Sequence, residues 1–291
     1  MTVVKHNPIP TLLFLLFSVI ALAQTGKVFD DLSMHSDILS MERKYAVYLP
    51  PDYEHSERRY PVLYLLHGGG DDQTGWVQFG EVLRIADQAI QHGSATAMII
   101  VMPDANSGHR GYFNRVDGSW DYEDFFFDEF IPEIEQKFRI KGEKRYRAVG
   151  GLSMGGGGSF MYALHRPDLF SSSCPLSAYV GPLSFDQARQ RYAKQHIDEA
   201  SEDVLRAHYE RHNALYLIDQ MDAEQIAEVR WFIDCGDDDF LFEGNSLVHI
   251  ALKKKEVDHE YRVRDGAHTW TYWRESLPFV LRFVSDAFHQ H

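Results

Sequence analysis

The stretch RAVGGLSMGGGGSF, residues 147–160, decides the fold that the rest of the sequence must build. It begins like a β-strand and then places six glycines around Ser153, a composition that favours neither a regular strand nor a helix. Gly151, Ser153 and Gly155 match the pattern G-x-S-x-G, in which a serine occupies a sharp turn between a strand and the following helix. Glycines on both sides let the strand and the helix approach closely, and N–H groups at the helix start point toward the reacting oxygen. We therefore predict a strand, a strained turn at Ser153 and a helix.

Three other uses of a glycine-rich turn have to be weighed. A phosphate-binding loop would end in Gly-Lys-Ser/Thr, and a dinucleotide-binding turn would read G-x-G-x-x-G with an acidic residue about 20 positions later. Residues 150–158 match neither pattern. A glycine-rich packing turn without chemistry stays open for the pentapeptide alone.

Strand-like and helix-like segments alternate along the rest of the chain. Apolar runs that stop at glycine, proline or polar residues indicate buried strands, and most are followed by helical spacing; examples are YPVLYLL, ATAMIIVM, YRAVGG, SSSCPLSAYV and VRWFIDC. The chain has 291 residues, 44% of them hydrophobic, which is enough to bury one large core. The alternation predicts an α/β fold with one mostly parallel central sheet and helices on both faces.

Residues 182–228 interrupt this alternation. They are polar, helical in period and contain no convincing strand. Ligands in such folds bind beyond the carboxyl ends of the strands, so an insertion there can form a lid or one wall of a cleft. A solvated helical decoration is the alternative.

The first 23 residues have the pattern of a cleaved leader. Lys5 and His6 precede an apolar run over residues 9–23, which ends in the small residues Ala21 and Ala23. The run is shorter than the roughly 20 residues of a membrane-spanning helix, which argues against an uncleaved anchor. We predict a signal peptide at residues 1–23, a mature domain at residues 24–291, export from the cytoplasm, and no membrane anchor after cleavage.

Charge and cysteine content narrow the function further. The net charge of −14 repels polyphosphates, and no segment concentrates Lys and Arg, so nucleic acid is not expected as a partner. Cys174 and Cys235 both fall in apolar, strand-like runs. Export would permit a disulfide between them, but two buried free thiols are the simpler interpretation.

A serine hydroxyl is a weak nucleophile unless an imidazole accepts its proton and a carboxylate orients that imidazole. For a G-x-S-x-G serine, the acid and then the histidine follow in the chain. CGDDDFLF follows the strand VRWFID, and DGAHTW follows the strand HEYRV, so both motifs lie at carboxyl ends of strands. We assign His268 as the base. The residues alone leave the acid open among four aspartates: Asp234, Asp237, Asp238 and Asp239.

The loop HGGGDD offers backbone N–H groups for the oxyanion that forms on the attacked carbonyl. We assign the two donors as the N–H of Gly69 and the N–H of Met154, which directly follows the nucleophile. His67 is interpreted as a residue that holds this loop by hydrogen bonding without taking a proton from substrate. Clustered aspartates also raise the question of calcium, but no ligand loop with a closing Glu is present, so neither a metal nor another cofactor is expected.

Several motifs together resemble a known family: YPVLYLLHGGGDDQTGW, GLSMGGGGSF, RPDLF, CGDDDFL and GAHTWTYW. They are similar to the esterases of carbohydrate esterase family 1, which includes feruloyl and acetylxylan esterases, over roughly residues 45–284. Related motifs occur in S-formylglutathione hydrolases and mycolyltransferases. The resemblance implies an α/β-hydrolase fold and a triad of Ser153, Asp239 and His268. It selects Asp239 because the family's acid follows a glycine by three residues and precedes an apolar pair.

The resemblance implies a serine carboxylic-ester hydrolase that acts on acyl groups of plant polysaccharide, above all feruloyl esters. The expected partner is a polysaccharide-linked or small ester. Trp120, Tyr112 and Trp270 are candidates for stacking on an aryl ring, although core positions are the alternative for them. An acetylxylan esterase, a sugar acyltransferase and a non-catalytic carbohydrate-binding protein are the other functions to be tested.

The sequence HYERH places His208 and His212 one helical turn apart, as metal ligands often are. It lacks the Glu of H-E-x-x-H, and no third ligand is indicated. We therefore predict an exposed helix face for this pair.

Overall fold

The computed structural model describes residues 24–194 and 200–289. The predicted signal peptide, residues 1–23, lies outside this part. Eight strands form one sheet in the order β1-β2-β4-β3-β5-β6-β7-β8. β1 and β2 pair antiparallel, β2 joins β4 antiparallel, and every pair from β4 to β8 is parallel. The strands are β1 (Lys27–Ser36), β2 (Met41–Leu49), β3 (Val62–Leu66), β4 (Ile99–Pro103), β5 (Arg147–Leu152), β6 (Ser172–Leu176), β7 (Arg230–Gly236) and β8 (Glu260–Arg264).

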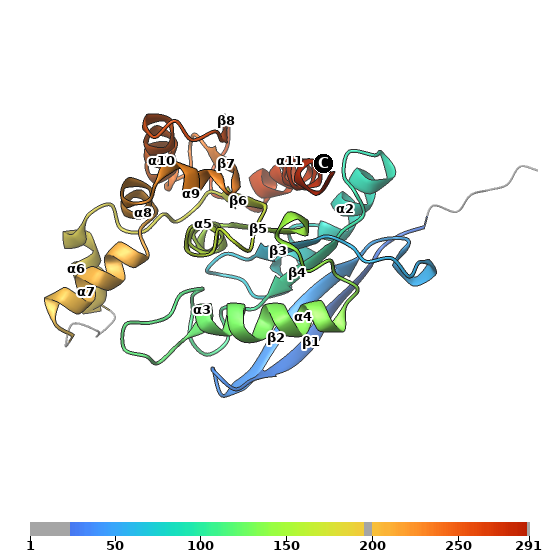
Figure 1. Cartoon of the computed structure of the whole chain (residues 1–291), viewed down its shortest axis with the longest axis horizontal. Helices are drawn as coiled ribbons and strands as arrows, with labels where there is room; N and C mark the ends of the chain where they lie inside the picture. Colours follow the sequence, from blue (N-terminus) through green and yellow to red (C-terminus); the bar gives the residue numbers. More distant parts are fainter. Residues whose placement is uncertain (1–23, 195–199, 290–291) are drawn as a thin grey trace, which may run out of the picture.

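Helices cover both faces of the sheet, as the alternation predicted (Figure 1). One face carries α2 and α11, and the other carries α4, α5 and α10. The helices outside the insertion are α1 (Gly75–Gln78), α2 (Val82–Gln91), α3 (Tyr122–Asp124), α4 (Ile131–Lys137), α5 (Met154–His165), α10 (Phe242–Lys254) and α11 (Trp270–His289). Two 3₁₀ turns, η1 (Tyr53–His55) and η3 (Lys144–Tyr146), and a π-helical segment, η2 (Phe125–Phe130), complete this part.

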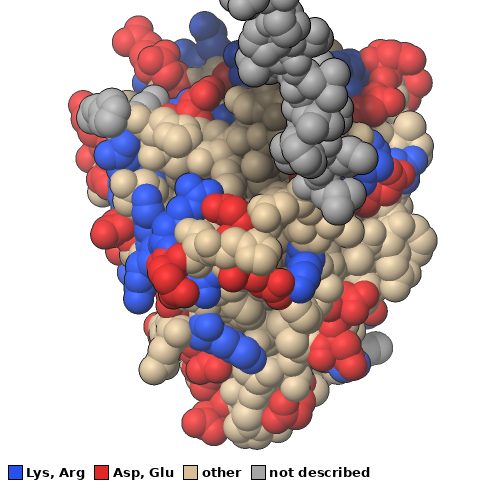
Figure 2. All heavy atoms as spheres, turned by 90° about the vertical axis from the view of Figure 1, so that its right-hand side faces the viewer, with Lys and Arg blue, Asp and Glu red and all other residues tan. Residues whose placement is uncertain are grey.

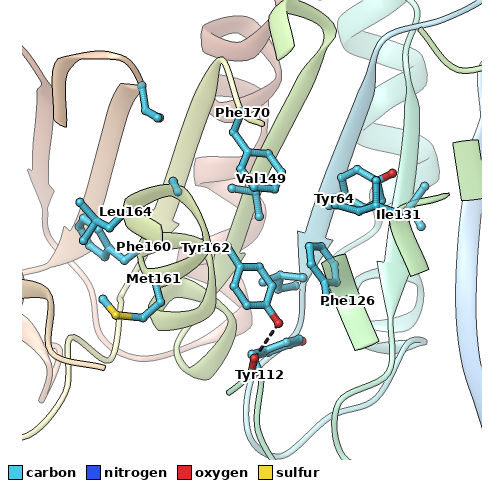
Figure 3. Close-up of a cluster of buried hydrophobic side chains, with 14 of the residues drawn as sticks. Tyr64, Tyr112, Phe126, Ile131, Val149, Phe160, Met161, Tyr162, Leu164 and Phe170 are labelled. Carbon is cyan, nitrogen blue, oxygen red and sulfur yellow. Dashed lines mark hydrogen bonds between the residues drawn. The ribbon is translucent and has the colours of Figure 1, made fainter. Parts of the chain in front are cut away.

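The two faces of the sheet bury two separate apolar clusters, because side chains alternate along each strand. On β3, Tyr64 and Leu66 belong to the cluster under α4 and α5, whereas Leu63 and Leu65 belong to the cluster under α2 and α11. Figure 3 shows the first cluster, in which the Tyr162 hydroxyl of α5 donates a hydrogen bond to the Tyr112 carbonyl, 2.7 Å away. Both faces of the central strands are therefore buried.

Residues between β6 and β7 form helices and, in the part that the structure describes, no strand. α6 and α7 project at one side of the molecule, and α8 lies near α10 (Figure 1). The four helices are α6 (Phe185–Lys194), α7 (Glu202–Arg211), α8 (Ala214–Gln220) and α9 (Ala223–Ala227).

The turn at Ser153 has the predicted strain. Its backbone adopts φ 55° and ψ −114°, which a residue with a side chain rarely does. The glycines that follow sit where backbone crosses backbone: a Cβ on Gly155 would lie 2.6 Å from the His67 carbonyl oxygen, and one on Gly157 would lie 2.2 Å from the Tyr179 carbonyl oxygen. Bare backbone is thus what lets α5 start between neighbouring strands.

We expect Gly157→Ala to lower the free energy of unfolding by about 1–3 kcal/mol, because the added methyl must push the Tyr179 backbone away. Gly70→Ala is the matched control, since a Cβ on Gly70 would meet nothing within 4 Å. Urea unfolding of both variants and the parent chain measures the difference. Equal midpoints for the two variants would show that α5 shifts freely and that the close approach is unimportant.

Candidate active site

Three side chains from three loops meet at the carboxyl end of the sheet. The Ser153 Oγ lies 2.9 Å from the His268 Nε2, and the His268 Nδ1 lies 2.8 Å from the Asp239 Oδ2 and 3.0 Å from its Oδ1. Ser153 follows β5, Asp239 follows β7 and His268 follows β8. With the Nδ1 proton donated to the carboxylate, the Nε2 is left free to accept the serine proton.

The geometry selects Asp239 among the four aspartates. Its side chain is buried and also accepts a hydrogen bond from the Leu241 N–H, 2.8 Å away. Burial alone would raise the pKa of Asp239, but the hydrogen bonds from His268, the Leu241 N–H and Ser177 outweigh it and hold that pKa below its usual value. A carboxylate that stays ionised is what the orienting role requires.

The other three aspartates point elsewhere. Asp234 is fully buried and accepts hydrogen bonds from the Tyr272 hydroxyl and from Arg264. Asp237 is exposed and accepts a hydrogen bond from the Gly266 N–H at 3.1 Å. Asp237 and Asp238 lie close to Asp265, but all three are exposed, and exposed acidic groups commonly gather without a metal.

The glycine loop after β3 lies beside the serine. Gly69, Ser153 and Met154 line the same cavity. Within the described residues, neither the Gly69 N–H nor the Met154 N–H has a hydrogen-bond acceptor. Both N–H groups are therefore available to a substrate oxygen, as the predicted oxyanion role requires.

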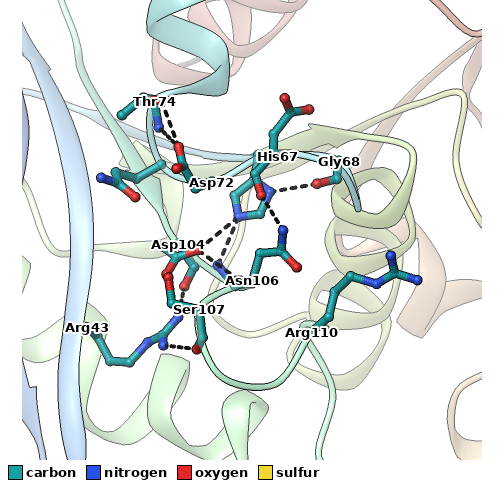
Figure 4. Close-up of polar contacts among 12 residues, drawn as sticks. Arg43, His67, Gly68, Asp72, Thr74, Asp104, Asn106, Ser107 and Arg110 are labelled. Atoms are coloured by element: carbon teal, nitrogen blue, oxygen red, sulfur yellow. Dashed lines mark hydrogen bonds and ion pairs between the residues drawn. The ribbon is translucent and has the colours of Figure 1, made fainter. Parts of the chain in front are cut away.

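His67 holds that loop in place through hydrogen bonds of its ring (Figure 4). Its Nε2 accepts a hydrogen bond from the Ala105 N–H at 2.9 Å, so the proton sits on Nδ1, which donates to the Gly68 carbonyl at 2.8 Å. The ring is 1% exposed, and burial lowers the pKa of His67. The backbone N–H of His67 also donates a hydrogen bond to the Tyr112 hydroxyl, 2.8 Å away. A neutral, buried His67 matches the loop-holding role inferred from the sequence.

A cavity of about 480 Å³ opens at Ser153. The loop after β4 supplies one wall, α6 and α7 supply a second, and Phe240 with Leu241 supplies a third. A smaller cavity of about 280 Å³ adjoins it and shares Tyr179, Arg191 and Phe240. The large cavity is rich in aromatic rings, namely those of Tyr112, Phe113, Tyr179, Tyr192, Tyr209 and Phe240.

The assembled triad, the free N–H groups and the cavity can now be compared with known proteins. Residues 36–284 match the model of the Esterase family. The chain belongs to the Esterase family. A solved ferulic acid esterase superimposes with a TM-score of 0.81 at 36% identity, covering 91% of this chain and 99% of that one. The α/β-hydrolase fold expected from the motifs is thereby confirmed.

Two curated proteins are similar to this Esterase-family chain. An endo-1,4-beta-xylanase/feruloyl esterase of Xylanibacter ruminicola is 38% identical over 79% of this chain and 28% of its own length. An acetyl esterase of Caldicellulosiruptor saccharolyticus is 24% identical over 77% of this chain and 83% of its own. The chain spans less than a third of the length of the first curated relatives that it matches.

The predicted aromatic platform is wrong for two of its three members, Trp120 and Trp270. Trp120 is 3% exposed, its Nε1 donates to the Gly111 carbonyl, and the Arg43 guanidinium lies over its ring. Trp270 packs edge-on against Trp76, with ring centroids 5.3 Å apart, and does not line the cavity. Tyr112 does reach the cavity, but it is 1% exposed and its hydroxyl is engaged with the His67 backbone. Trp120 and Tyr112 are buried in the core, and Trp270 is partly buried against Trp76 outside the cavity.

The exposed face predicted for His208 and His212 is also wrong. His208 accepts a hydrogen bond from the Tyr192 hydroxyl at Nδ1 and donates from Nε2 to the Asn114 carbonyl. Burial and the neighbouring His212 lower the pKa of His208 to about 4, so its ring is neutral at pH 7. Both histidines line the cavity and face the loop after β4.

One buried carboxylate connects α7 to the rest of the chain. Glu123 lies 2.6 Å from the His165 Nδ1, 3.2 Å from the Arg211 Nη2 and 3.5 Å from the His212 Nε2. Burial would raise the pKa of Glu123, but the hydrogen bond from His165 and the proximity of His212 outweigh it and hold that pKa far below its usual value. The insertion is thereby tied to α3 and α5.

Sequence reasoning missed Phe240, which is 75% exposed although it is a large apolar residue. Its ring centroid lies 4.4 Å from that of His268. The signal was present in the motif CGDDDFLF, since Phe240 directly follows the assigned acid. Because Phe240 also lines the cavity at Ser153, it is a candidate for contact with substrate.

The two cysteines are free and buried. Burial raises the pKa of the Cys235 thiol to about 12 and raises that of Cys174 further, so neither is a thiolate at pH 7. Among the helices of residues 24–194 and 200–289, none combines the length and the apolar character that crossing a bilayer requires.

Proposed function

We propose that this protein is an exported serine esterase that removes feruloyl groups from plant polysaccharide. The observation that carries the proposal is the hydrogen-bonded chain Ser153–His268–Asp239 at the mouth of an aromatic cavity of about 480 Å³. Export is supported by the leader pattern of residues 1–23, which would bring the mature enzyme to polymers outside the cytoplasm.

In the proposed reaction, the Ser153 Oγ attacks the ester carbonyl while the His268 Nε2 accepts its proton. The Gly69 and Met154 N–H groups donate hydrogen bonds to the oxyanion. His268 then gives the proton to the departing alkoxide, so the alcohol leaves and an acyl group stays on Ser153. Water, deprotonated by His268, releases the acid, and the serine regains its proton.

Feruloyl esters are favoured over acetyl esters by the size and lining of the cavity. An acetyl group would fill a small part of 480 Å³, whereas a feruloyl group can contact several of the rings. Two similar proteins carry feruloyl or ferulic acid esterase in their names. Acetylxylan is the second candidate, and the similar acetyl esterase supports it.

One observation argues against a non-catalytic carbohydrate-binding protein, and one experiment separates hydrolysis from acyl transfer to a sugar. A non-catalytic carbohydrate-binding protein has no use for a triad with hydrogen-bond distances of 2.9 Å and 2.8 Å. A sugar acyltransferase would use the same serine but pass the acyl group to a sugar hydroxyl. Product analysis with an added oligosaccharide acceptor separates transfer from hydrolysis.

The substrate proposal is tested by kcat/KM for methyl ferulate, acetylated xylan and p-nitrophenyl butyrate on one preparation. We expect methyl ferulate to be preferred. Phe240→Ala should lower kcat/KM for methyl ferulate by about threefold to tenfold more than for p-nitrophenyl butyrate, because a ring–ring contact is lost.

Phe279→Ala is the control, since Phe279 is an exposed ring on α11 outside the cavity. A clear preference for acetylated xylan would overturn the feruloyl assignment while leaving the triad in place. An equal loss on both small esters in Phe240→Ala would assign Phe240 to positioning His268 rather than to the aryl group.

A further inference from the structure

The cavity carries a charge opposite to that of the protein. The whole chain has 43 Asp and Glu against 29 Lys and Arg, and the face shown in Figure 2 mixes both signs. Among the described residues that line the large cavity, three are arginines and none is Asp or Glu. Such a cleft concentrates positive potential at the site and attracts anions. The arginines are Arg110, Arg115 and Arg191.

Arg110 lies next to the oxyanion loop. Its Nη1 donates to the Gly69 carbonyl at 3.2 Å, and its side chain is exposed. Within the described residues no carboxylate lies within 4.0 Å of it. One of its five N–H groups is used in this contact. Because Arg110 lines the cavity, its other N–H groups are available to a ligand there.

Arg191 comes from the opposite wall, on α6. Its guanidinium carbon lies 4.7 Å from the centroid of the Tyr179 ring, and it donates a hydrogen bond to the Tyr179 hydroxyl. No carboxylate of the described residues pairs with it either. Arg115 differs from both, because Asp117 neutralises it at 3.3 Å. Two arginines therefore present uncompensated charge to the cavity from two sides.

We propose that Arg110 and Arg191 form a subsite for a carboxylate carried by the ester substrate. The inference rests on the proposed esterase function and narrows its substrate class to acidic esters. A guanidinium fork matches the two oxygens of a carboxylate, and the stacking of Arg191 on Tyr179 holds that fork in place. The carboxylate can belong to the acyl group, as in a dicarboxylic half-ester, or to the alcohol, as in a uronic acid.

Paired esters that differ only in charge distinguish the two sources. For the acyl side, 4-nitrophenyl hemiglutarate is compared with its neutral methyl ester. For the alcohol side, the feruloyl ester of methyl glucuronide is compared with that of methyl glucoside. The readout is the ratio of kcat/KM between the charged and the neutral member, since the chemistry intrinsic to each ester cancels when variants are compared.

We expect Arg110→Gln and Arg191→Gln each to lower this ratio by about twofold to fivefold in one of the two arms, the size of a solvent-accessible ion pair. The double variant should lower it further. Because mobile ions screen charges, the preference should shrink between 20 mM and 500 mM NaCl. Arg84→Gln on α2 is the control, since it changes the net charge equally at a residue paired with Glu81 outside the cavity.

A ratio that is unchanged in both arms would overturn the subsite. If kcat/KM falls equally for the charged and the neutral ester, the ratio is also unchanged, and the arginines would be assigned to stacking on the acyl group. Failure to hydrolyse any neutral ester would instead contradict the proposed function. In that event, calorimetric titration of Ser153→Ala with each pair still tests the subsite, which requires tighter binding of a charged member that is lost in the double arginine variant.

Discussion

Ser153→Ala is expected to lower kcat for p-nitrophenyl acetate to less than about a thousandth of the parent value. The expectation follows from the position of the hydroxyl, which lies 2.9 Å from the His268 Nε2 on a strained turn. Removing a triad nucleophile eliminates the covalent route and leaves the weaker assistance of the oxyanion donors. Steady-state hydrolysis on purified protein measures the loss.

A fluorophosphonate probe gives the matching control. It should label the parent chain at Ser153 and fail to label Ser153→Ala, while an unchanged urea midpoint shows that the variant is folded. Retention of more than a thousandth of the parent turnover by folded, unlabelled protein would remove Ser153 from the mechanism.

Asp239→Asn is expected to reduce kcat by about a thousandfold or more, although it keeps nearly the same shape. The Asn amide can donate a hydrogen bond to the His268 Nδ1, which would leave the proton on Nε2, the nitrogen that has to accept the serine proton. Asp237→Asn and Asp238→Asn are the matched controls. Both are exposed, and neither side chain contacts His268.

Kinetics of the three variants on p-nitrophenyl acetate separate the positions. A loss at Asp238→Asn as large as that at Asp239→Asn would place the acid one residue earlier in the chain. A small loss at Asp239→Asn would mean that His268 keeps its tautomer without the carboxylate.

The order of the triad could be predicted because it depends on local signals. Glycines that flank Ser153 mark the turn, and Asp239 and His268 each follow an apolar strand, so the parallel sheet delivers all three to one edge. Choosing among neighbouring aspartates needed the family resemblance, because a shift of one residue in a loop changes direction without changing composition.

Secondary structure was less predictable where backbone geometry overrides propensity. Residues 75–91 have helical spacing throughout, but the structure divides them into α1 and α2. Glu81 adopts φ 53° at the break, and a Cβ on Gly80 would lie 2.5 Å from the Trp76 ring. The close approach of Gly80 to that ring coincides with the break, and the helical spacing of the sequence does not reveal it.

The cavity wall could not be predicted from the sequence, since it forms between segments far apart in the chain. Trp120 and Trp270 are aromatic in the way a platform requires, but only the fold reveals that Trp120 is buried and that Trp270 packs against Trp76 outside the cavity. The i, i+4 spacing of His208 and His212 correctly indicates a shared helix face. It carries no information about the loop that this face meets.

The fastening of α7 through Glu123 has a consequence for how such enzymes diversify. The triad stands on loops at strand ends, whereas the opposing cavity wall comes largely from one continuous segment that leaves after β6 and returns before β7. A lineage can therefore exchange that segment wholesale, altering which molecules are admitted, without disturbing proton transfer. What has to be inherited together is the anchoring carboxylate on α3 and its cationic and imidazole partners. Specificity and chemistry are therefore separable heritable modules in this architecture, and the buried Glu123 cluster is one of the contacts that join them.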